Sequence, residues 1–157
     1  VLHLQELEKP APRDNEILIK VQAAAANPYD WRHLRADPFF IRFMDAGLLK
    51  PKHRILGADI AGRVEAVGRH ARQFRPGDEV FGEGRYGGFA EYACCSESRF
   101  VKKPARLSFV EAAAVPMAAL TALQGLRDKG GIRGWAFRSL RCGTRVTTTA
   151  SWSSASA

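Results

Sequence analysis

Closely spaced glycines between positions 57 and 92 constrain the fold of this 157-residue chain more than any other feature. The segment reads GADIAGRVEAVGRHARQFRPGDEVFGEGRYGGFAEY. Glycine is favoured where a chain turns sharply or approaches itself closely, and the apolar residues between these glycines alternate with a strand's two-residue period. The pattern therefore predicts short antiparallel strands that bend strongly, as in a small β-barrel.

Alternating apolar residues and turn signals predict the elements of the first hundred residues. The expected strands are Glu16–Gln22, Asp59–Ala66, Glu79–Phe81 and Phe89–Cys94. Asn27-Pro28 is expected to end strand pairing in a turn, because proline carries no N–H. Asp37-Pro38 is typical of a helix start, and that helix is expected to end at Gly47.

Two consecutive helical segments are expected after the strands. Ser108 and Glu111 have the spacing of a capping box. Pro116 should divide the alanine-rich helix that follows, and the second part should run from Met117 to about Arg127. Gly130-Gly131 is expected to terminate it.

Composition and charge exclude several classes of partner. The net charge of +8 would suit nucleic acid, but basic and acidic residues are interleaved and no basic cluster carries aromatic residues for stacking. No apolar run approaches the ~18 residues of a membrane helix. Of the three cysteines, Cys94 and Cys95 are adjacent and should point to opposite faces of a strand. A disulfide framework is not expected, which favours a cytoplasmic protein.

Residues 134–157 have a different composition from the rest of the chain. They contain three arginines, no acidic residue and a final Ser/Thr/Ala run, and hydrophobic periodicity stops there. Two interpretations remain open, an out-of-frame or otherwise aberrant C-terminus and a genuine disordered tail. The expected organisation is one domain over residues 1–133, including the start of the linking helix, followed by this tail.

An ordered series of motifs carries a resemblance to a known family. Three motifs follow one another in the order found in the medium-chain dehydrogenase/reductase superfamily. They are G-x-D-x-A-G-x-V-x-x-V-G, F-x-x-G-D-x-V-x-G and G-x-F-A-E-Y. Over roughly residues 2–133 the chain resembles the N-terminal GroES-like domain of that superfamily, in its zinc-independent quinone oxidoreductase-like branch. The resemblance implies a mainly β fold with some α, a GroES-like bent β-barrel with flanking helices, and a truncated Rossmann domain.

The resemblance also argues against zinc. Zinc-dependent members hold the metal with cysteine and histidine at three positions, which match Asn27, Ala58 and Met117 in this chain. None of these side chains is a good zinc ligand, so a metal-free site is expected.

The N-P-x-D segment is the expected catalytic site. By resemblance Asn27, Tyr29 and Asp30 line the cleft beside the nicotinamide, and Asn27 and Thr121 contact the cofactor. The alternatives are a turn-forming asparagine, a core-packing tyrosine and a threonine bonded to its own helix backbone. Asp59 is expected to be structural.

A match to the dinucleotide fingerprint G-x-G-x-x-G occurs at residues 82–87. The fingerprint needs a following helix whose N-terminus meets the pyrophosphate, but residues 88–92 have a strand pattern. These glycines are therefore expected to form a turn between strands.

The resemblance implies an NAD(P)H-dependent oxidoreductase that passes hydride, without zinc, between NADPH and a small-molecule carbonyl or quinone. A homodimer of the intact protein is compatible with it. Because the nucleotide-binding half is missing, this chain is expected to be inactive alone. The alternative function is a non-catalytic β-barrel interaction module that self-associates.

Overall fold

The computed structural model describes residues 3–35 and 54–131. The chain divides into two compact units, residues 1–121 and 122–157. The sheet and the candidate site both belong to the first unit. The helix expected from Asp37 to Gly47 and the tail from residue 134 lie outside the described residues.

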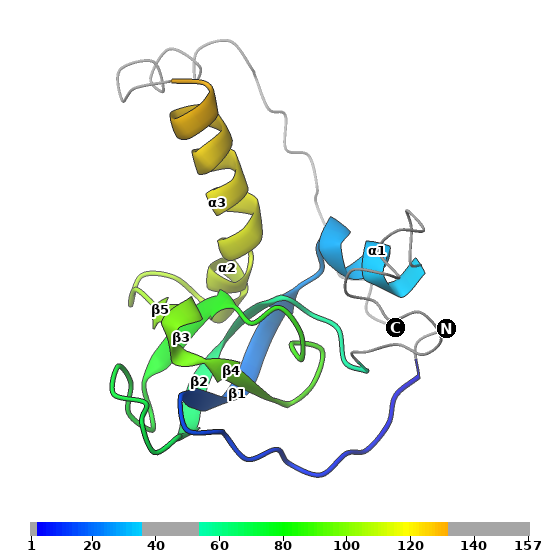
Figure 1. The fold of residues 1–157 in the computed structure, drawn as a ribbon, viewed down its shortest axis with the longest axis vertical. Helices are drawn as coiled ribbons and strands as arrows, with labels where there is room; N and C mark the ends of the chain where they lie inside the picture. The colour runs from blue at the N-terminus through cyan, green and yellow to red at the C-terminus, as the bar shows by residue number, and fades with distance from the viewer. Residues whose placement is uncertain (1–2, 36–53, 132–157) are drawn as a thin grey trace, which may run out of the picture. The chain divides into compact units, whose positions relative to one another are not determined.

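A five-stranded antiparallel sheet forms the centre of the first unit (Figure 1). The strands are β1 (Glu16–Ala25), β2 (Asp59–Val67), β3 (Glu79–Glu83), β4 (Tyr92–Ser96) and β5 (Phe100–Lys102). Their order in the sheet is β4-β1-β2-β3-β5. The expected mainly β fold with flanking helices is confirmed. Among the described residues, however, the hydrogen-bonded sheet is not closed, because β4 and β5 each pair on one side only.

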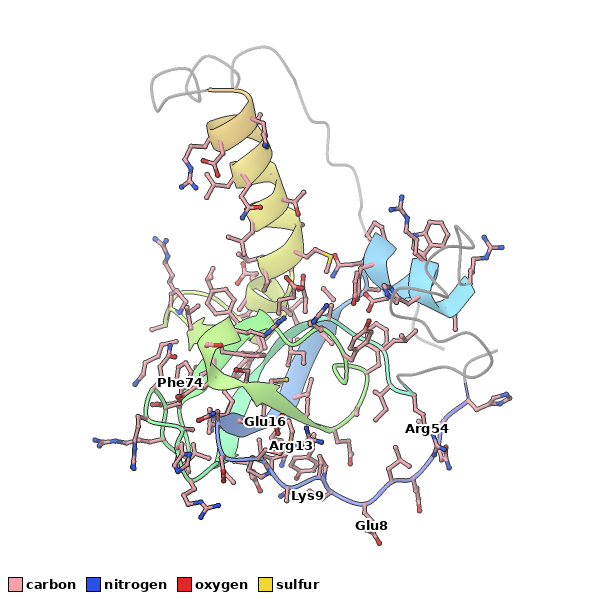
Figure 2. All side chains as sticks on the ribbon, viewed as in Figure 1. Glu8, Lys9, Arg13, Glu16, Arg54 and Phe74 are labelled. Atoms are coloured by element: carbon pink, nitrogen blue, oxygen red, sulfur yellow. The ribbon has the colours of Figure 1, made fainter. Side chains whose placement is uncertain are left out.

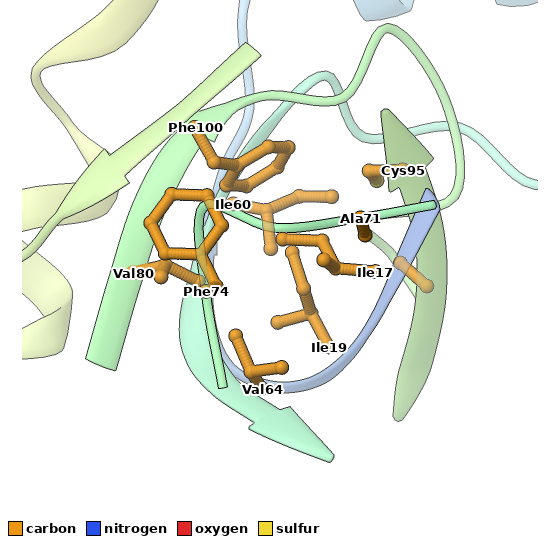
Figure 3. Close-up of a cluster of buried hydrophobic side chains, with 10 residues drawn as sticks. Ile17, Ile19, Ile60, Val64, Ala71, Phe74, Val80, Cys95 and Phe100 are labelled. Carbon is orange, nitrogen blue, oxygen red and sulfur yellow. The ribbon is translucent and has the colours of Figure 1, made fainter. Parts of the chain in front are cut away.

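The main core lies on one face of the sheet and receives side chains from all five strands (Figure 3). Ile17, Ile19 and Ile60 are fully buried in it. Phe74, from the loop between β2 and β3, packs with Phe100 of β5 in the same cluster. The alternation seen in the sequence therefore has a direct cause, since every second residue of a strand points into this core.

The opposite face of β2 is covered by α2 (Phe109–Ala113). Ile60 belongs to the main core, whereas its neighbour Ala61 packs against Ala112 and Ala113 of α2. All three alanines are buried. Short side chains on both elements allow the helix to lie close to the sheet.

Strand pairing ends before Asn27-Pro28 as expected, but the turn predicted there is wrong, because the segment after β1 is a helix. Helix α1 spans Pro28–Arg35. The Asn27 N–H donates to Asp30 Oδ2 at 2.8 Å, and the Asp30 N–H donates to the Asn27 carbonyl at 3.0 Å. Asn27 is thus followed by a proline in the first helical position, Pro28, and by an acidic residue in the first helical turn, Asp30. That combination is itself a helix-start signal.

Strand β4 begins three residues later than expected, at Tyr92 rather than Phe89. The N–H groups of Gly88 and Phe89 donate to the carbonyls of Gly57 and Leu56, at 2.8 and 2.9 Å. These residues therefore bond to the loop before β2 instead of the sheet. The turn expected at residues 82–87 is confirmed, because β3 leads into it and no helix follows.

The helical predictions after β5 are confirmed. Ser108 and Glu111 form the capping box of α2, and α3 (Pro116–Gln124) begins at the expected proline. A π-helical turn, Gly125–Lys129, continues α3, and Gly131 then adopts a φ of 61°. Among the described residues no helix is long and apolar enough to cross a membrane.

The N-terminal segment is joined to the sheet by polar contacts. Figure 2 shows Arg13 and Glu16 at the start of β1, where the Arg13 N–H donates to Glu16 Oε2 at 3.0 Å. Lys9 Nζ lies 2.7 Å from Glu65 Oε1 of β2. Both of these charged side chains are exposed, so solvent screens the ion pair and it contributes little to stability.

Candidate functional site

Asp30 fixes the start of α1 against the loop that leads into β2. Its carboxylate is buried and accepts two backbone hydrogen bonds, from the Asn27 N–H at 2.8 Å and the Gly57 N–H at 3.0 Å. Both oxygens are used, and each bond to a charged acceptor is stronger than a neutral one. Asp30 therefore holds Asn27 and Gly57 in place.

The side chain of Asn27 is held by two acceptors. Its Nδ2 donates to Asp59 Oδ2 at 3.1 Å and to the Ala25 carbonyl at 3.5 Å. An amide oxygen could not replace Nδ2 beside two acceptors, so the orientation of the carboxamide follows from its partners. The amide of Asn27 is thus turned toward the first residue of β2.

Asp59 connects Asn27 with the beginning of α3. Asp59 is fully buried, and its Oδ2 also accepts the Met117 N–H at 3.0 Å. The first N–H groups of a helix lack partners within the helix and favour negative charge, which explains an acidic residue here. Asp59 Oδ1 has no hydrogen-bond partner among the described residues.

Burial raises the pKa of Asp59 above its ordinary value of 3.8, since desolvation penalises the charged form. The hydrogen bonds from Met117 and Asn27 oppose the rise. The nearby carboxylates of Glu83 and Asp30 add to it. Desolvation, the largest of these effects, therefore sets the direction of the pKa shift of Asp59.

An open pocket of about 400 Å³ lies beside Asn27 and α1. It is lined by Ala26, Asn27, Pro28, Asp30, Trp31, Leu34, Leu56 and Phe89. Six of these eight residues are apolar, and the Trp31, Leu34 and Phe89 side chains remain 44%, 46% and 43% exposed. Large apolar side chains left in contact with solvent around a small number of polar groups are typical of a ligand site.

Tyr29 lies in a separate aromatic cluster beside the pocket. Its hydroxyl is 2.7 Å from that of Tyr86, and its ring lies 4.1 Å from the ring of His33. Tyr29 is not among the residues that line the pocket. Its hydroxyl is therefore engaged by Tyr86 in this structure, and a role in catalysis would require that contact to change.

The structure places both Asn27 and Asp30 in the lining of the pocket. Thr121 is exposed on α3, one helical turn beyond Met117, so it stands about 6 Å further along the helix from the Asp59 contact. Sequence reasoning missed the contributions of Leu34, Leu56 and Phe89. The aromatic Phe89, directly after Gly87-Gly88, was the one sequence signal for a residue of the pocket wall. Its position beside α1, however, depends on its hydrogen bond to the loop before β2.

The three positions that match zinc ligands lie close to one another. Asn27 and Met117 both donate to Asp59, and Ala58 is its buried neighbour. A carboxamide, a methyl group and a thioether do not form a zinc site. Within residues 3–35 and 54–131, no group of three or more His, Cys, Asp or Glu side chains could hold a metal ion.

The stability of this domain should depend on the protonation of Asp59. Because the pKa of Asp59 is raised in the fold, this group contributes stability below pH 3.8, its ordinary pKa, and loses it as the pH rises through the raised value. An Asp59→Asn variant has no such group. We expect the wild-type free energy of unfolding to fall relative to the variant above about pH 4.

Urea unfolding of both proteins between about pH 3.5 and pH 8 measures this difference. Exposed carboxylates titrate equally in the two proteins, so their effects cancel. A difference that does not change with pH, or one that grows in favour of wild type, would show that the pKa of Asp59 is not raised.

Comparisons with known proteins identify the domain. The model of the alcohol dehydrogenase GroES-like domain matches residues 13–105. A chloroplast envelope quinone oxidoreductase homolog of Arabidopsis thaliana is 35% identical over 132 residues, which are 79% of this chain and 37% of that protein. Human quinone oxidoreductase is 33% identical over 125 residues, 77% of this chain and 35% of the relative.

Solved structures show the same similarity. The quinone oxidoreductase of Coxiella burnetii superposes with a TM-score of 0.73 at 34% identity, over 85% of this chain and 42% of that one. The chain thus spans 37% of the length of the Arabidopsis relative and 35% of that of the human one.

Proposed function

Because the chain belongs to the medium-chain dehydrogenase/reductase superfamily, of which it contains the N-terminal GroES-like domain, we propose that it forms the substrate wall of an NAD(P)H-dependent oxidoreductase. The observation that carries this proposal is the position of Asn27. A polar side chain held on two sides projects from the start of α1 at the edge of an apolar pocket. Similar proteins are described as quinone oxidoreductases.

The residues of the chain would bind and orient the reacting groups. Trp31, Leu34 and Phe89 offer apolar surface to the ring or chain of a small carbonyl or quinone compound and exclude water from one side of it. Asp30 and Asp59 hold Asn27 in position. Asn27 and Thr121 would lie nearest the nicotinamide, which supplies hydride when the cofactor is bound.

The described residues do not themselves form a dinucleotide-binding fold. All strand pairs among them are antiparallel, and the glycine-rich turn at residues 82–87 leads into β4 rather than into a helix. A pyrophosphate site of the usual kind needs a helix N-terminus after such a turn. NADPH would therefore be bound mainly by protein outside these residues.

The isolated 157-residue chain is expected to show little or no NADPH-dependent reductase activity. Its turnover with 1,4-benzoquinone should stay below about 0.01 s⁻¹, far under the 1–10³ s⁻¹ common among enzymes. Steady-state absorbance of NADPH measures it. Turnover at an ordinary enzymatic rate would contradict the proposal that cofactor binding resides elsewhere.

A chimera tests the proposed function directly. Residues 1–131 are joined to the nucleotide-binding half of the Coxiella burnetii quinone oxidoreductase, whose fold this chain shares. The chimera should oxidise NADPH with a panel of quinones and enones, whereas that half alone should not. In the chimera, Asn27→Ala should lower kcat/KM about tenfold, the size expected for the loss of one polar contact with the nicotinamide. A folded chimera that binds NADPH and reduces none of these compounds would refute the proposal.

A further inference from the structure

The amide orientation of Asn27 determines which of its polar atoms a ligand can meet. Both acceptors near the side chain, Asp59 Oδ2 and the Ala25 carbonyl, are bonded to Nδ2. Asn27 is only partly buried and belongs to the pocket lining. Its Oδ1 has no hydrogen-bond partner among the described residues. The polar atom that remains for a ligand is therefore an acceptor.

We propose that Asp59 is a positioning residue that keeps Nδ2 of Asn27 turned away from the ligand, so that the pocket selects compounds that donate a hydrogen bond to Asn27 Oδ1. The inference rests on the proposed function in one respect, because it takes this pocket as the substrate site. The inference adds that the selected ligand donates a hydrogen bond to the pocket, which the proposed function leaves open.

The surroundings of Asp59 suit this role. Asp59 is the first residue of β2 and pairs on one side with Ala25 of β1 and on the other with Glu83 of β3. Its Oδ2 receives the Met117 N–H as well as Asn27 Nδ2. A neutral carboxylic acid with its proton on Oδ1 would accept the same two bonds at Oδ2. The orientation of Asn27 is therefore kept in either protonation state.

The other pocket walls narrow the ligand class. Leu34 and Phe89 carry no polar side-chain atom, and the indole N–H of Trp31 can only donate. Both oxygens of Asp30 are occupied by backbone N–H groups, so Asn27 Oδ1 is the side-chain acceptor left for a ligand in this lining. An apolar ring that carries one hydroxyl group matches this surface. In a carbonyl and hydroxyl redox pair, only the hydroxyl member can donate to Oδ1. The pocket should thus hold an aromatic alcohol or a hydroquinone more tightly than the corresponding carbonyl compound.

Two probes that differ in one donor hydrogen test the proposal on the full 157-residue chain. 1-Naphthol can donate to Oδ1, whereas 1-methoxynaphthalene cannot. Titrations are followed by ¹⁵N–¹H NMR at the Trp31 indole and the Asn27 side-chain amide. Wild type should bind 1-naphthol about tenfold more tightly, the upper range for one neutral hydrogen bond. Equal affinities for the two probes would overturn the proposal.

Two variants separate the positioning role of Asp59 from a general effect on the pocket. Asp59→Asn retains an oxygen where Oδ2 lies and should keep the preference for 1-naphthol. Asp59→Ala removes the acceptor, frees the carboxamide to turn and should reduce the preference to about twofold or less. A preference that survives unchanged in a folded Asp59→Ala protein would refute the positioning role.

A measurement on the wild-type protein tests the orientation of the Asn27 amide even if the Asp59→Ala variant does not fold. The Asn27 side-chain amide and the Met117 N–H bond to the same oxygen, so a nuclear Overhauser effect should connect their protons. Its absence would refute the proposed orientation. None of these measurements uses NADPH or turnover, so an inactive chimera with a clear naphthol preference would contradict the proposed function alone.

Discussion

Replacing Gly57 by alanine is expected to destabilise the domain by about 2–5 kcal/mol. Gly57 has a φ of 96°, a conformation that residues with a Cβ adopt only with strain. An added Cβ would lie 2.6 Å from the Phe89 nitrogen and 2.8 Å from Gly88 Cα, which are backbone atoms that cannot move aside alone. The Gly57 N–H also donates to Asp30, so the pocket should be disturbed together with the fold.

Gly77 provides a matched control for this variant. Its φ is 95°, almost the same, but nothing lies within 4 Å of the position of an added Cβ. Gly77→Ala should therefore show the conformational strain alone, about 1–2 kcal/mol. Urea midpoints of the two variants measure the difference. Equal losses of stability would show that the close approach of residues 88 and 89 to Gly57 contributes nothing.

Phe100→Ala is expected to cost about 3–5 kcal/mol of folding free energy. Phe100 is 1% exposed and is the largest fully buried side chain within residues 3–35 and 54–131. It lies on β5, a strand of three residues at the edge of the sheet, which pairs with β3 alone in the part of the chain that the structure describes. Removing the ring leaves a cavity in the main core, and the short strand has few other contacts with which to close it. Thermal and urea unfolding measure the loss.

Phe89→Ala is the matched control, since the same atoms are removed from a residue that is 43% exposed. Its cost should stay below about 1.5 kcal/mol, because the aromatic ring is already half in solvent. It should nevertheless weaken binding of 1-naphthol, because Phe89 lines the pocket. A stability loss equal to that of Phe100→Ala would show that Phe89 belongs to the core.

Local patterns were sufficient for most of the sheet. Ile17 and Ile19 alternate with polar residues, and the structure places both in the main core. The capping box at Ser108 and the helix start at Pro116 are also local, since they involve residues within one helical turn. Helix α1 was missed because the proline after Asn27 was interpreted as a turn, although Asp30 supplies the usual acid of a first helical turn.

The alternation of apolar residues could not predict contacts between segments that are distant in the sequence. Phe89 was assigned to a strand because its neighbours alternate, but its N–H bonds to the Leu56 carbonyl, 33 residues earlier in the chain. The same loop brings Phe89 into the wall of the pocket. No periodicity within a segment records a partner in another segment, so the pocket walls could not be predicted.

The sequence by itself determined the fold class, the strands of the core and the family, because alternation, glycine spacing and capping are encoded within short stretches of chain. Only the tertiary structure decided which atom of Asn27 meets a ligand. That choice depends on Asp59, 32 residues away, whose Oδ2 attracts the amide nitrogen and leaves the oxygen for the pocket. This hydrogen bond joins the residue before α1 to the first residue of β2, so it depends on how the sheet brings the two segments together, and the sheet forms only when the whole domain folds.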